Sequence, residues 1–461
     1  MPDAKPQSAP RDLIRVLDGG HATAIVIGTI IGSGIFLVPH KMMAAAGSAT
    51  MVNLVWVVGG VLSLFGALTY AELGAMKPQA GGEYVYIRDA YGPLPAFLYM
   101  WTWFIVSKPA SVGSICIGLM MTLANIPALS ILGRAAVHHP LEISYAQLGA
   151  IAVAWIMTGL NYIGVKRAAD FQLAFTILKV LMILAIVAIG FSYIDGSMLN
   201  FGIPYVHAKG GIAGFMAALI AALWAYDGWN DLSMVAGEVK NPERNLPKAL
   251  VLGVLAVGIL YLLTNAAVQY VLPAATLGEV KTPVAFAVGR VLGGGGGIII
   301  ACGIALSLIV SVNGTIMSGA RVPFAAARDG YFFNSLATVS PRFRTPSASL
   351  LVQGLLSTAL ILLVSAFEDL FDLAIYSEWL FYMIAASTIF VFRNREPKAY
   401  RPYRLAGYPA IPALFVAAAA VLLYYSFVEN LRNSAICTLV ILAGIPLFYA
   451  INARRQRTHI S

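Results

Sequence analysis

The chain has 461 residues, of which 59% are hydrophobic and only 11% are charged, and its formal net charge is +9. Soluble domains contain about 25% charged residues, so this composition cannot form a water-soluble surface, and lipid must cover much of the protein. The basic excess would suit a nucleic-acid-binding protein, but its distribution, described below, belongs to a membrane face, and nucleic acid is not an expected partner.

Apolar segments recur along almost the whole chain and leave no room for a soluble domain. Segment 1–20 is polar and has no signal-peptide core, so the first apolar segment is expected to remain as an anchor. A transmembrane helix needs about 20 mostly apolar residues. The sequence therefore predicts an all-α membrane protein with one domain, 21–453, and a short tail, 454–461. The twelve expected spans are 22–45, 50–75, 93–123, 147–163, 168–193, 212–236, 247–271, 296–327, 346–366, 373–393, 409–427 and 434–453.

Lys and Arg are distributed unevenly between the two sides of these spans. If segment 1–20 is inside, the inner segments contain 22 of the 30 basic residues, the outer segments contain 6, and Lys108 and Lys179 lie within spans. Basic residues concentrate in cytoplasmic loops. We therefore expect a multi-pass protein of the cell membrane with both termini in the cytoplasm.

Two spans are interrupted in a similar way. Residues 28–36 read GTIIGSGIF, and residues 224–230 read WAYDGWN. A lone glycine pair would indicate close helix packing. Two interruptions five spans apart instead predict an inverted repeat, 21–195 and 211–393, with the binding site between its halves.

An interrupted helix leaves backbone groups that lipid cannot satisfy. The N–H groups of Gly32, Ser33 and Gly34 start the outer half of the first broken span and suit an anion such as a carboxylate. Carbonyls near Ile30 and in the second interruption suit a cation. Donors facing acceptors predict an α-amino acid zwitterion as the ligand.

Several motifs together resemble amino acid–polyamine–organocation permeases, and in particular their L-type amino acid transporter branch. The interruption at 28–36 resembles the first span of these permeases. The other matching segments are 224–230, Glu238 with 241–247 (NPERNLP), Lys108-Pro109, Asn313-Gly314, 327–330 (ARDG) and 379–382 (WLFY).

The resemblance implies a LeuT-like fold of five plus five inverted-repeat helices, followed by two extra helices at 409–453. It also implies that the first interruption holds the substrate carboxylate, that backbone carbonyls hold the amine, and that Trp224 is an aromatic gate. Members of this branch usually exchange one amino acid for another without sodium. The expected substrate-binding residues are Ile30, Gly32, Ser33, Gly34, Trp224, Ala225, Asp227 and Asn230.

Two lysines within spans are costly to bury and need an explanation. In related transporters the lysine matching Lys179 faces the broken first span, where sodium-coupled relatives hold a cation. A fixed ammonium there would replace sodium, or Lys179 would carry a proton in a proton-coupled amino acid symporter. Lys108 precedes Pro109, and we expect it to bond helix carbonyls that the proline frees.

Carboxylates within and beside the spans allow two readings. Asp227 and Glu378 would recognise a basic side chain, or Asp227 would bond its own broken helix while Glu378 pairs with a lysine. Glu72 and Glu238 are expected to pair with nearby basic residues. Segment 77–88 is expected to be an amphipathic element at the interface that helps to close the inner gate.

No nucleophile, metal-ligand or phosphate-loop motif of an enzyme is present, and the filter loops of a channel are missing. We therefore expect neither catalysis nor a metal or cofactor. The three cysteines, Cys116, Cys302 and Cys437, lie in apolar runs and are expected to be small buried hydrophobes. The outer loop 125–144 has no cysteine, so no disulfide-linked heavy subunit is expected. The sequence does not rank individual amino acids.

Overall fold

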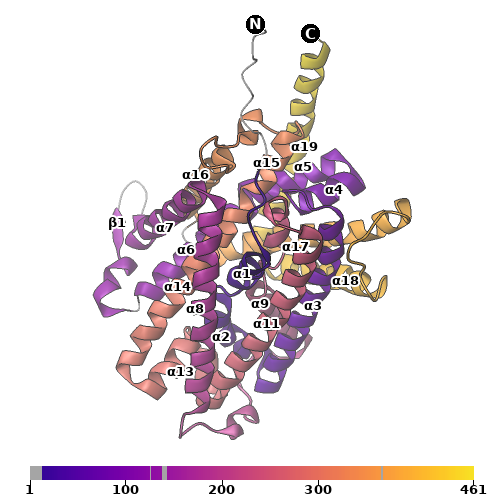
Figure 1. The fold of residues 1–461 in the computed structure, drawn as a ribbon. Coiled ribbons are helices and arrows are strands. Elements are labelled where there is room, and N and C mark those ends of the chain that lie inside the picture. The colour runs from indigo at the N-terminus through magenta and orange to yellow at the C-terminus, as the bar shows by residue number, and fades with distance from the viewer. Residues whose placement is uncertain (1–12, 125, 138–142, 365–366, 461) are drawn as a thin grey trace.

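A computed structural model describes residues 13–124, 126–137, 143–364 and 367–460. Its long helices run roughly along one common direction and form a bundle (Figure 1). The helices are α1 Gly19–Ile30, α2 Gly34–Ala46, α3 Ala49–Met76, α4 Glu83–Tyr91, α5 Pro93–Thr102, α6 Lys108–Ala124, α7 Tyr145–Tyr162, α8 Val165–Phe191, α9 Gly211–Ala225, α10 Asp231–Met234, α11 Pro242–Val271, α12 Ala274–Glu279, α13 Pro283–Leu292, α14 Gly294–Gly319, α15 Arg321–Arg328, α16 Ser347–Leu363, α17 Phe367–Arg395, α18 Ala410–Glu429 and α19 Leu431–Ile460.

Short elements join these helices. Four are 3₁₀ turns: η2 Pro127–Gly133, η3 Met198–Phe201, η4 Ala236–Glu238 and η5 Asn334–Ala337. One is a π-helical turn, η1 Trp103–Ser107, between α5 and α6. The outer loop after α6 contains a small antiparallel pair that was not anticipated, β1 Ala135–Val137 with β2 Ile143–Ser144. Apart from this pair and one isolated β-bridge between Leu17 and Val239, the regular secondary structure of the described residues is helical, as expected of an all-α membrane protein.

Nine helical stretches within the described residues are long and apolar enough to cross a bilayer. They coincide with nine of the twelve expected spans. The other three expected spans coincide with α7, α9 and α16, which have 18, 15 and 17 residues. Helix α9 is short because the chain leaves the helix after Ala225, at the second interruption.

The structure changes three expectations about single elements. Helix α11 begins at Pro242, five residues before the expected start, because a proline fits the first turn of a helix, where its missing N–H has no partner to lose. Helix α4 does not lie on the surface of the protein as an amphipathic element would: its first five side chains, from Glu83 to Ile87, are all buried. Cys302 is exposed on the side of α14 and is not buried, unlike Cys116 and Cys437.

The first broken span lies at the centre of the bundle. Helix α1 packs on α8, α11 and α14, and α2 packs along α9. Helix α2, which follows the first interruption, therefore lies beside α9, which precedes the second, and α1 likewise contacts α10. Nearly 200 residues separate the two interruptions in the chain.

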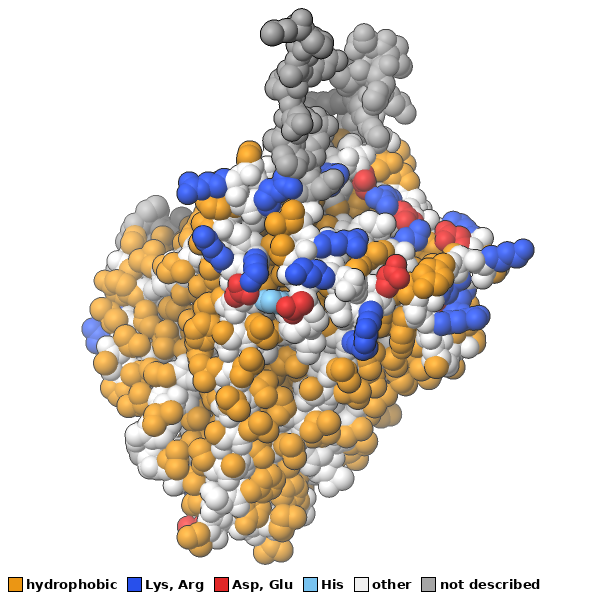
Figure 2. Space-filling model, viewed as in Figure 1, with side chains coloured by type: hydrophobic (Ala, Val, Ile, Leu, Met, Phe, Trp, Pro, Cys, Tyr) orange, Lys and Arg blue, Asp and Glu red, His pale blue; other side chains and the backbone are white. Residues whose placement is uncertain are grey.

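Basic side chains gather at the end of the molecule toward which α19 runs (Figure 2). Ion pairs tie the helices together there. Glu72 of α3 is fully buried and pairs with Arg393 of α17 at 2.7 Å and with Arg401 at 3.2 Å. Glu238 pairs with Arg321 of α15 at 2.8 Å, and both side chains are fully buried. The expectation that Glu72 and Glu238 pair with basic residues is confirmed. We call this end the inner face.

Candidate functional site

The two helix interruptions pack directly on each other. A Cβ atom on Gly34 would lie 2.6 Å from the Cα of Ala225, so only glycine allows this approach. Gly228 has φ of 98°, a conformation that favours glycine, and a Cβ there would lie 2.8 Å from the side chain of Thr29. Glycine is therefore needed at these two positions because the broken helices approach each other closely. A general need for flexibility would not explain this contact.

A polar cavity of about 40 Å³ lies where the two interruptions meet. Seven of the eight expected substrate-binding residues line it, and Asn230 lies outside it. Side chains from α6 and α14 complete the wall. The lining residues are Thr29, Ile30, Gly32, Ser33, Gly34, Lys108, Ser111, Ser114, Ile115, Trp224, Ala225, Asp227, Gly228, Asp231 and Thr315.

Hydrogen-bond donors are available on the side of the first interruption. The hydroxyl of Ser33 is buried and has no hydrogen-bond partner in the described structure. The N–H groups of Ser33 and Gly34 likewise have no internal acceptor there. The N–H of Gly32, in contrast, donates to the carbonyl of Ile30 at 2.7 Å. Two of the three expected backbone donors are therefore free to bind an anion in this conformation.

Tyr261, which the sequence did not point to, brings together two of the expected acceptor carbonyls. The hydroxyl of Tyr261, in α11, lies 2.9 Å from the carbonyl oxygen of Ile30 and 2.9 Å from that of Ala225. These two carbonyls, one from each interruption, therefore face the same point. A tyrosine within an apolar span carries no pattern of its own, so only the fold could identify it.

Lys179 lies against the first interruption, as the resemblance implied. Its ammonium donates to the carbonyls of Gly28 at 2.8 Å and Ile31 at 2.5 Å, and to the hydroxyl of Ser311 at 3.3 Å. The hydroxyl of Ser307 also donates to the carbonyl of Ile31 at 3.1 Å. All three acceptors of Lys179 are neutral oxygens, the type of ligand that hard metal cations prefer.

Lys108 has different partners from those expected. Its ammonium lies 2.9 Å from a carboxylate oxygen of Asp231 and 3.4 Å from one of Glu378, and 4.3 Å from the centre of the Trp103 ring. The prediction that Lys108 bonds the carbonyls freed by Pro109 is therefore wrong. Two carboxylates outcompete neutral carbonyls for a buried ammonium because charge-assisted bonds are stronger. Of the two interpretations of Glu378, the structure agrees with the one in which it pairs with a lysine.

Asp227 projects into the cavity and accepts a hydrogen bond from the hydroxyl of Tyr382, in α17, at 2.8 Å. The same hydroxyl lies 3.1 Å from the side-chain oxygen of Asn230. The amide of Asn230 in turn donates to Glu83 of α4 at 2.8 Å. Asn230 is therefore positioned behind the cavity wall, between the cavity and the inner face.

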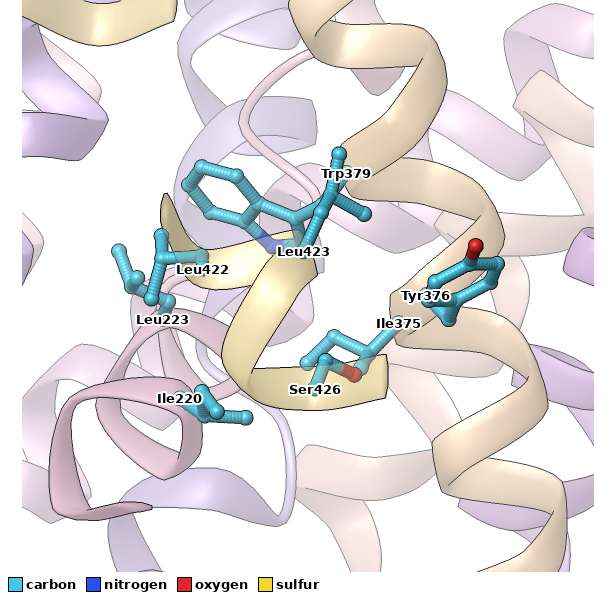
Figure 3. A pocket seen from close by; sticks show the side chains of 8 residues that line it. All are labelled: Ile220, Leu223, Ile375, Tyr376, Trp379, Leu422, Leu423 and Ser426. Carbon is cyan, nitrogen blue, oxygen red and sulfur yellow. The ribbon is translucent and has the colours of Figure 1, made fainter. Parts of the chain in front are cut away.

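A second cavity, of about 10 Å³, lies between α9, α17 and α18 (Figure 3). Its lining is almost wholly apolar, with Trp379 and Leu423 above Ile375 and Ile220 in the view. Trp379 also packs on Phe415 of α18, with ring centres 5.8 Å apart. Trp379 therefore fixes α17 against α18 and does not enter the polar cavity.

Known proteins match this chain over most of its length. The profile of the amino acid permease family matches residues 19–449. The serine/threonine exchanger SteT of Bacillus subtilis is 33% identical over 439 residues, which are 94% of this chain and 96% of that protein. The b(0,+)-type amino acid transporter 1 of Homo sapiens is 31% identical, over 92% of this chain and 85% of its own. The human cystine/glutamate transporter is 30% identical, over 92% and 83%. These relatives are transporters, and none is an enzyme.

Proposed function

This chain belongs to the amino acid permease family, and on that premise we propose that it exchanges amino acids across the cell membrane without sodium. The observation that carries the proposal is the position of Lys179. Its ammonium is held by two backbone carbonyls and a hydroxyl at the first interruption. A fixed positive charge at this point supplies what a bound sodium ion would supply, so the cycle needs no sodium.

The cavity has the chemistry to bind an α-amino acid. The free N–H groups of Ser33 and Gly34, with the Ser33 hydroxyl, would donate to the carboxylate. The carbonyls of Ile30 and Ala225 would accept from the amine, since a carbonyl that already bonds Tyr261 retains a second lone pair. Trp224 lines the same cavity and is suited to cover a bound substrate.

The charges around the cavity favour neutral and cationic side chains over acidic ones. Three carboxylates, those of Asp227, Asp231 and Glu378, gather near the single ammonium of Lys108. Lys108 already pairs with two of them, so it is not free to bind an acidic substrate. The carboxylate of Asp227 retains an oxygen that a basic side chain could reach.

Transport would proceed by alternating access. A cavity of about 40 Å³ holds only a few water molecules, because one water needs roughly 10–15 Å³ measured in this way. The broken helices must therefore move relative to α6 and α14 for a substrate to enter. No disulfide-linked subunit is part of this proposal, since the thiols of Cys116 and Cys437 are buried and Cys302 lies on a span.

A second function, proton-coupled symport through Lys179, has one observation in its favour. Lys179 is 1% exposed, and none of the described hydrogen-bond partners of its ammonium is a carboxylate. A lysine in such surroundings could bind and release a proton during the transport cycle. A proton gradient would then drive uptake.

Counterflow in proteoliposomes separates the two functions. With exchange, internal unlabelled amino acid accelerates uptake of external labelled amino acid, and neither sodium nor an imposed pH gradient adds accumulation. A competitor panel of neutral, cationic and acidic amino acids in the same assay defines the substrate class. Uptake that requires a pH gradient and ignores internal amino acid would establish the symporter instead.

A further inference from the structure

A chain of hydrogen bonds leads from the polar cavity to the inner face. It starts at Asp227 on the cavity wall, passes through the hydroxyl of Tyr382 and the amide of Asn230, and ends at Glu83. Each link is between 2.8 and 3.1 Å long. The state of the Glu83 carboxyl is therefore linked to residues that line the cavity.

Glu83 differs from the other buried glutamates of the inner face. Glu72 and Glu238 each pair with arginine, whereas no described cation lies within ion-pair distance of Glu83. Its side chain is fully buried, and its Oε2 atom accepts no hydrogen bond from any described residue. A buried carboxylate without a cation is strongly disfavoured, and a bound proton removes that cost. Among the described residues, the ionisable groups that act on Glu83 are the phenols of Tyr70, Tyr86, Tyr99 and Tyr382 and the ammonium of Lys108.

Burial changes the pKa of Glu83, which lies in α4, outside the spans. Burial raises the pKa of its carboxyl to about 7, although hydrogen bonding by Asn230 and the charge of Lys108 oppose the rise. In water the pKa of a glutamic acid is about 4.3. Near neutral pH the docked carboxyl of Glu83 therefore retains its proton in a large share of molecules, whereas the hydrated carboxyl has released it.

The turn that precedes Glu83 packs on α10, the short helix that follows the second interruption. The N–H of Gly81 donates to the carbonyl of Met234, in α10, at 2.9 Å. Gly82 has φ of 46°, and a Cβ there would lie 2.8 Å from the sulfur of Met234. Glu83 directly follows this turn, so we expect that separation of α10 from the turn exposes Glu83 to water.

We propose that the Glu83 carboxyl is a proton-binding site of the inner gate, protonated while α4 is docked on α10 and ionised when the gate opens. The proton leaves Glu83 for water at the inner face and returns from the same face, so no proton crosses the membrane. The proposal rests on the proposed transport function, because it concerns the gate of that cycle. It assigns Glu83 a role in positioning the gate, without substrate contact.

The sign of the effect follows from the two proton affinities. The docked state binds the proton more tightly, so acid favours a closed gate. This preference is complete below the pKa of the hydrated carboxyl and disappears as pH rises through about 7. Exchange should therefore be slower in acid and accelerate around neutral pH when both sides share one pH.

The test uses Glu83→Gln, a neutral side chain of the same shape, with Glu243→Gln as matched control, because Glu243 is exposed at the inner face. Exchange is measured in proteoliposomes with equal pH on both sides, at a series of pH values. We expect a transition near pH 7 in the unchanged protein and in Glu243→Gln, and a slow rate independent of pH in Glu83→Gln. A transition that persists in Glu83→Gln overturns the proposal.

Infrared difference spectroscopy of the purified protein gives a readout without transport. A protonated buried carboxyl has a C=O stretching band that titrates, and we expect that band to disappear in Glu83→Gln alone. If the band is present but counterflow fails, the transport function is wrong and the proton site stands. If Glu83→Gln does not fold, titration of the band in the unchanged protein decides: no protonated carboxyl near neutral pH refutes the site.

Discussion

Lys108 and Lys179 are both buried within spans, yet their surroundings are opposite. Lys108 lies between two carboxylates, whereas Lys179 is bonded only to neutral oxygens. An ammonium between carboxylates is held firmly and joins three helices. An ammonium on carbonyls depends on the helix interruption that frees those carbonyls, so Lys179 and the geometry of residues 28–36 depend on each other.

Replacing Lys179 by methionine should therefore damage transport more than folding. Methionine preserves most of the volume but leaves the carbonyls of Gly28 and Ile31 with fewer donors. Hydrogen bonds to charged groups contribute about 1.5–3 kcal/mol each, so we expect a loss of exchange of roughly tenfold or more. Exchange and thermal stability are measured together in Lys179→Met and in the control Lys166→Met, whose side chain is 61% exposed on the same helix. Exchange at the original rate in Lys179→Met would show that the ammonium is not needed.

Asp227 offers a second prediction at the level of one side chain. Asp227→Asn retains an oxygen that can accept from Tyr382 but removes the negative charge at the cavity. We expect arginine and lysine to compete about 10- to 100-fold less well, the equivalent of about 1.5–3 kcal/mol, with neutral amino acids nearly unaffected. The control is Asp195→Asn, exposed beyond the end of α8. If neither substrate class changes, Asp227 is structural.

At the level of helices, the sequence predicts the elements better than their contacts. Each of the twelve expected spans overlaps a helix, and nine of these helices are long and apolar enough to cross a bilayer, because an apolar run of sufficient length is itself the signal. The pairing of Glu72 and Glu238 with arginines also followed from charge alone. The partners of Lys108, the bridge made by Tyr261 and the docking of α4 did not. These depend on which helices meet, and no periodicity of a single chain encodes that.

The contact between the two interruptions gives a prediction at this level. Gly34→Ala would place a methyl group 2.6 Å from the Cα of Ala225, so α2 and α9 must move apart. Overpacking of this kind costs about 1–3 kcal/mol. We expect a folded protein with a lower melting temperature and little exchange.

The matched control for this prediction is Gly159→Ala. Gly159 lies in α7, and a Cβ there meets no atom within 4 Å. Since alanine favours a helix over glycine by about 1 kcal/mol, this variant should be as stable as the original or more stable. Normal exchange in Gly34→Ala would mean that the close approach of the interruptions is dispensable.

For the molecule as a whole, the uneven distribution of basic residues determines how the bundle should lie in the membrane. Lys and Arg concentrate at one end in Figure 2, and α4, which holds Glu83, and α15, whose Arg321 pairs with Glu238, lie toward the same end in Figure 1. If this end faces the cytoplasm, the proton site of the gate responds to cytoplasmic pH. The orientation therefore decides which compartment regulates the transporter.

Cysteine labelling tests that orientation with two matched lysines. Lys281, between α12 and α13, and Lys398, between α17 and α18, are both exposed, and three expected spans separate them. Each is changed to cysteine in a background without Cys116, Cys302 and Cys437, and intact cells are treated with a maleimide that cannot cross membranes. We expect Lys281→Cys to react in intact cells and Lys398→Cys to react only after permeabilisation, because positive loops remain in the cytoplasm. The reverse pattern would invert the molecule, and labelling of both in intact cells would require an even number of crossings between them.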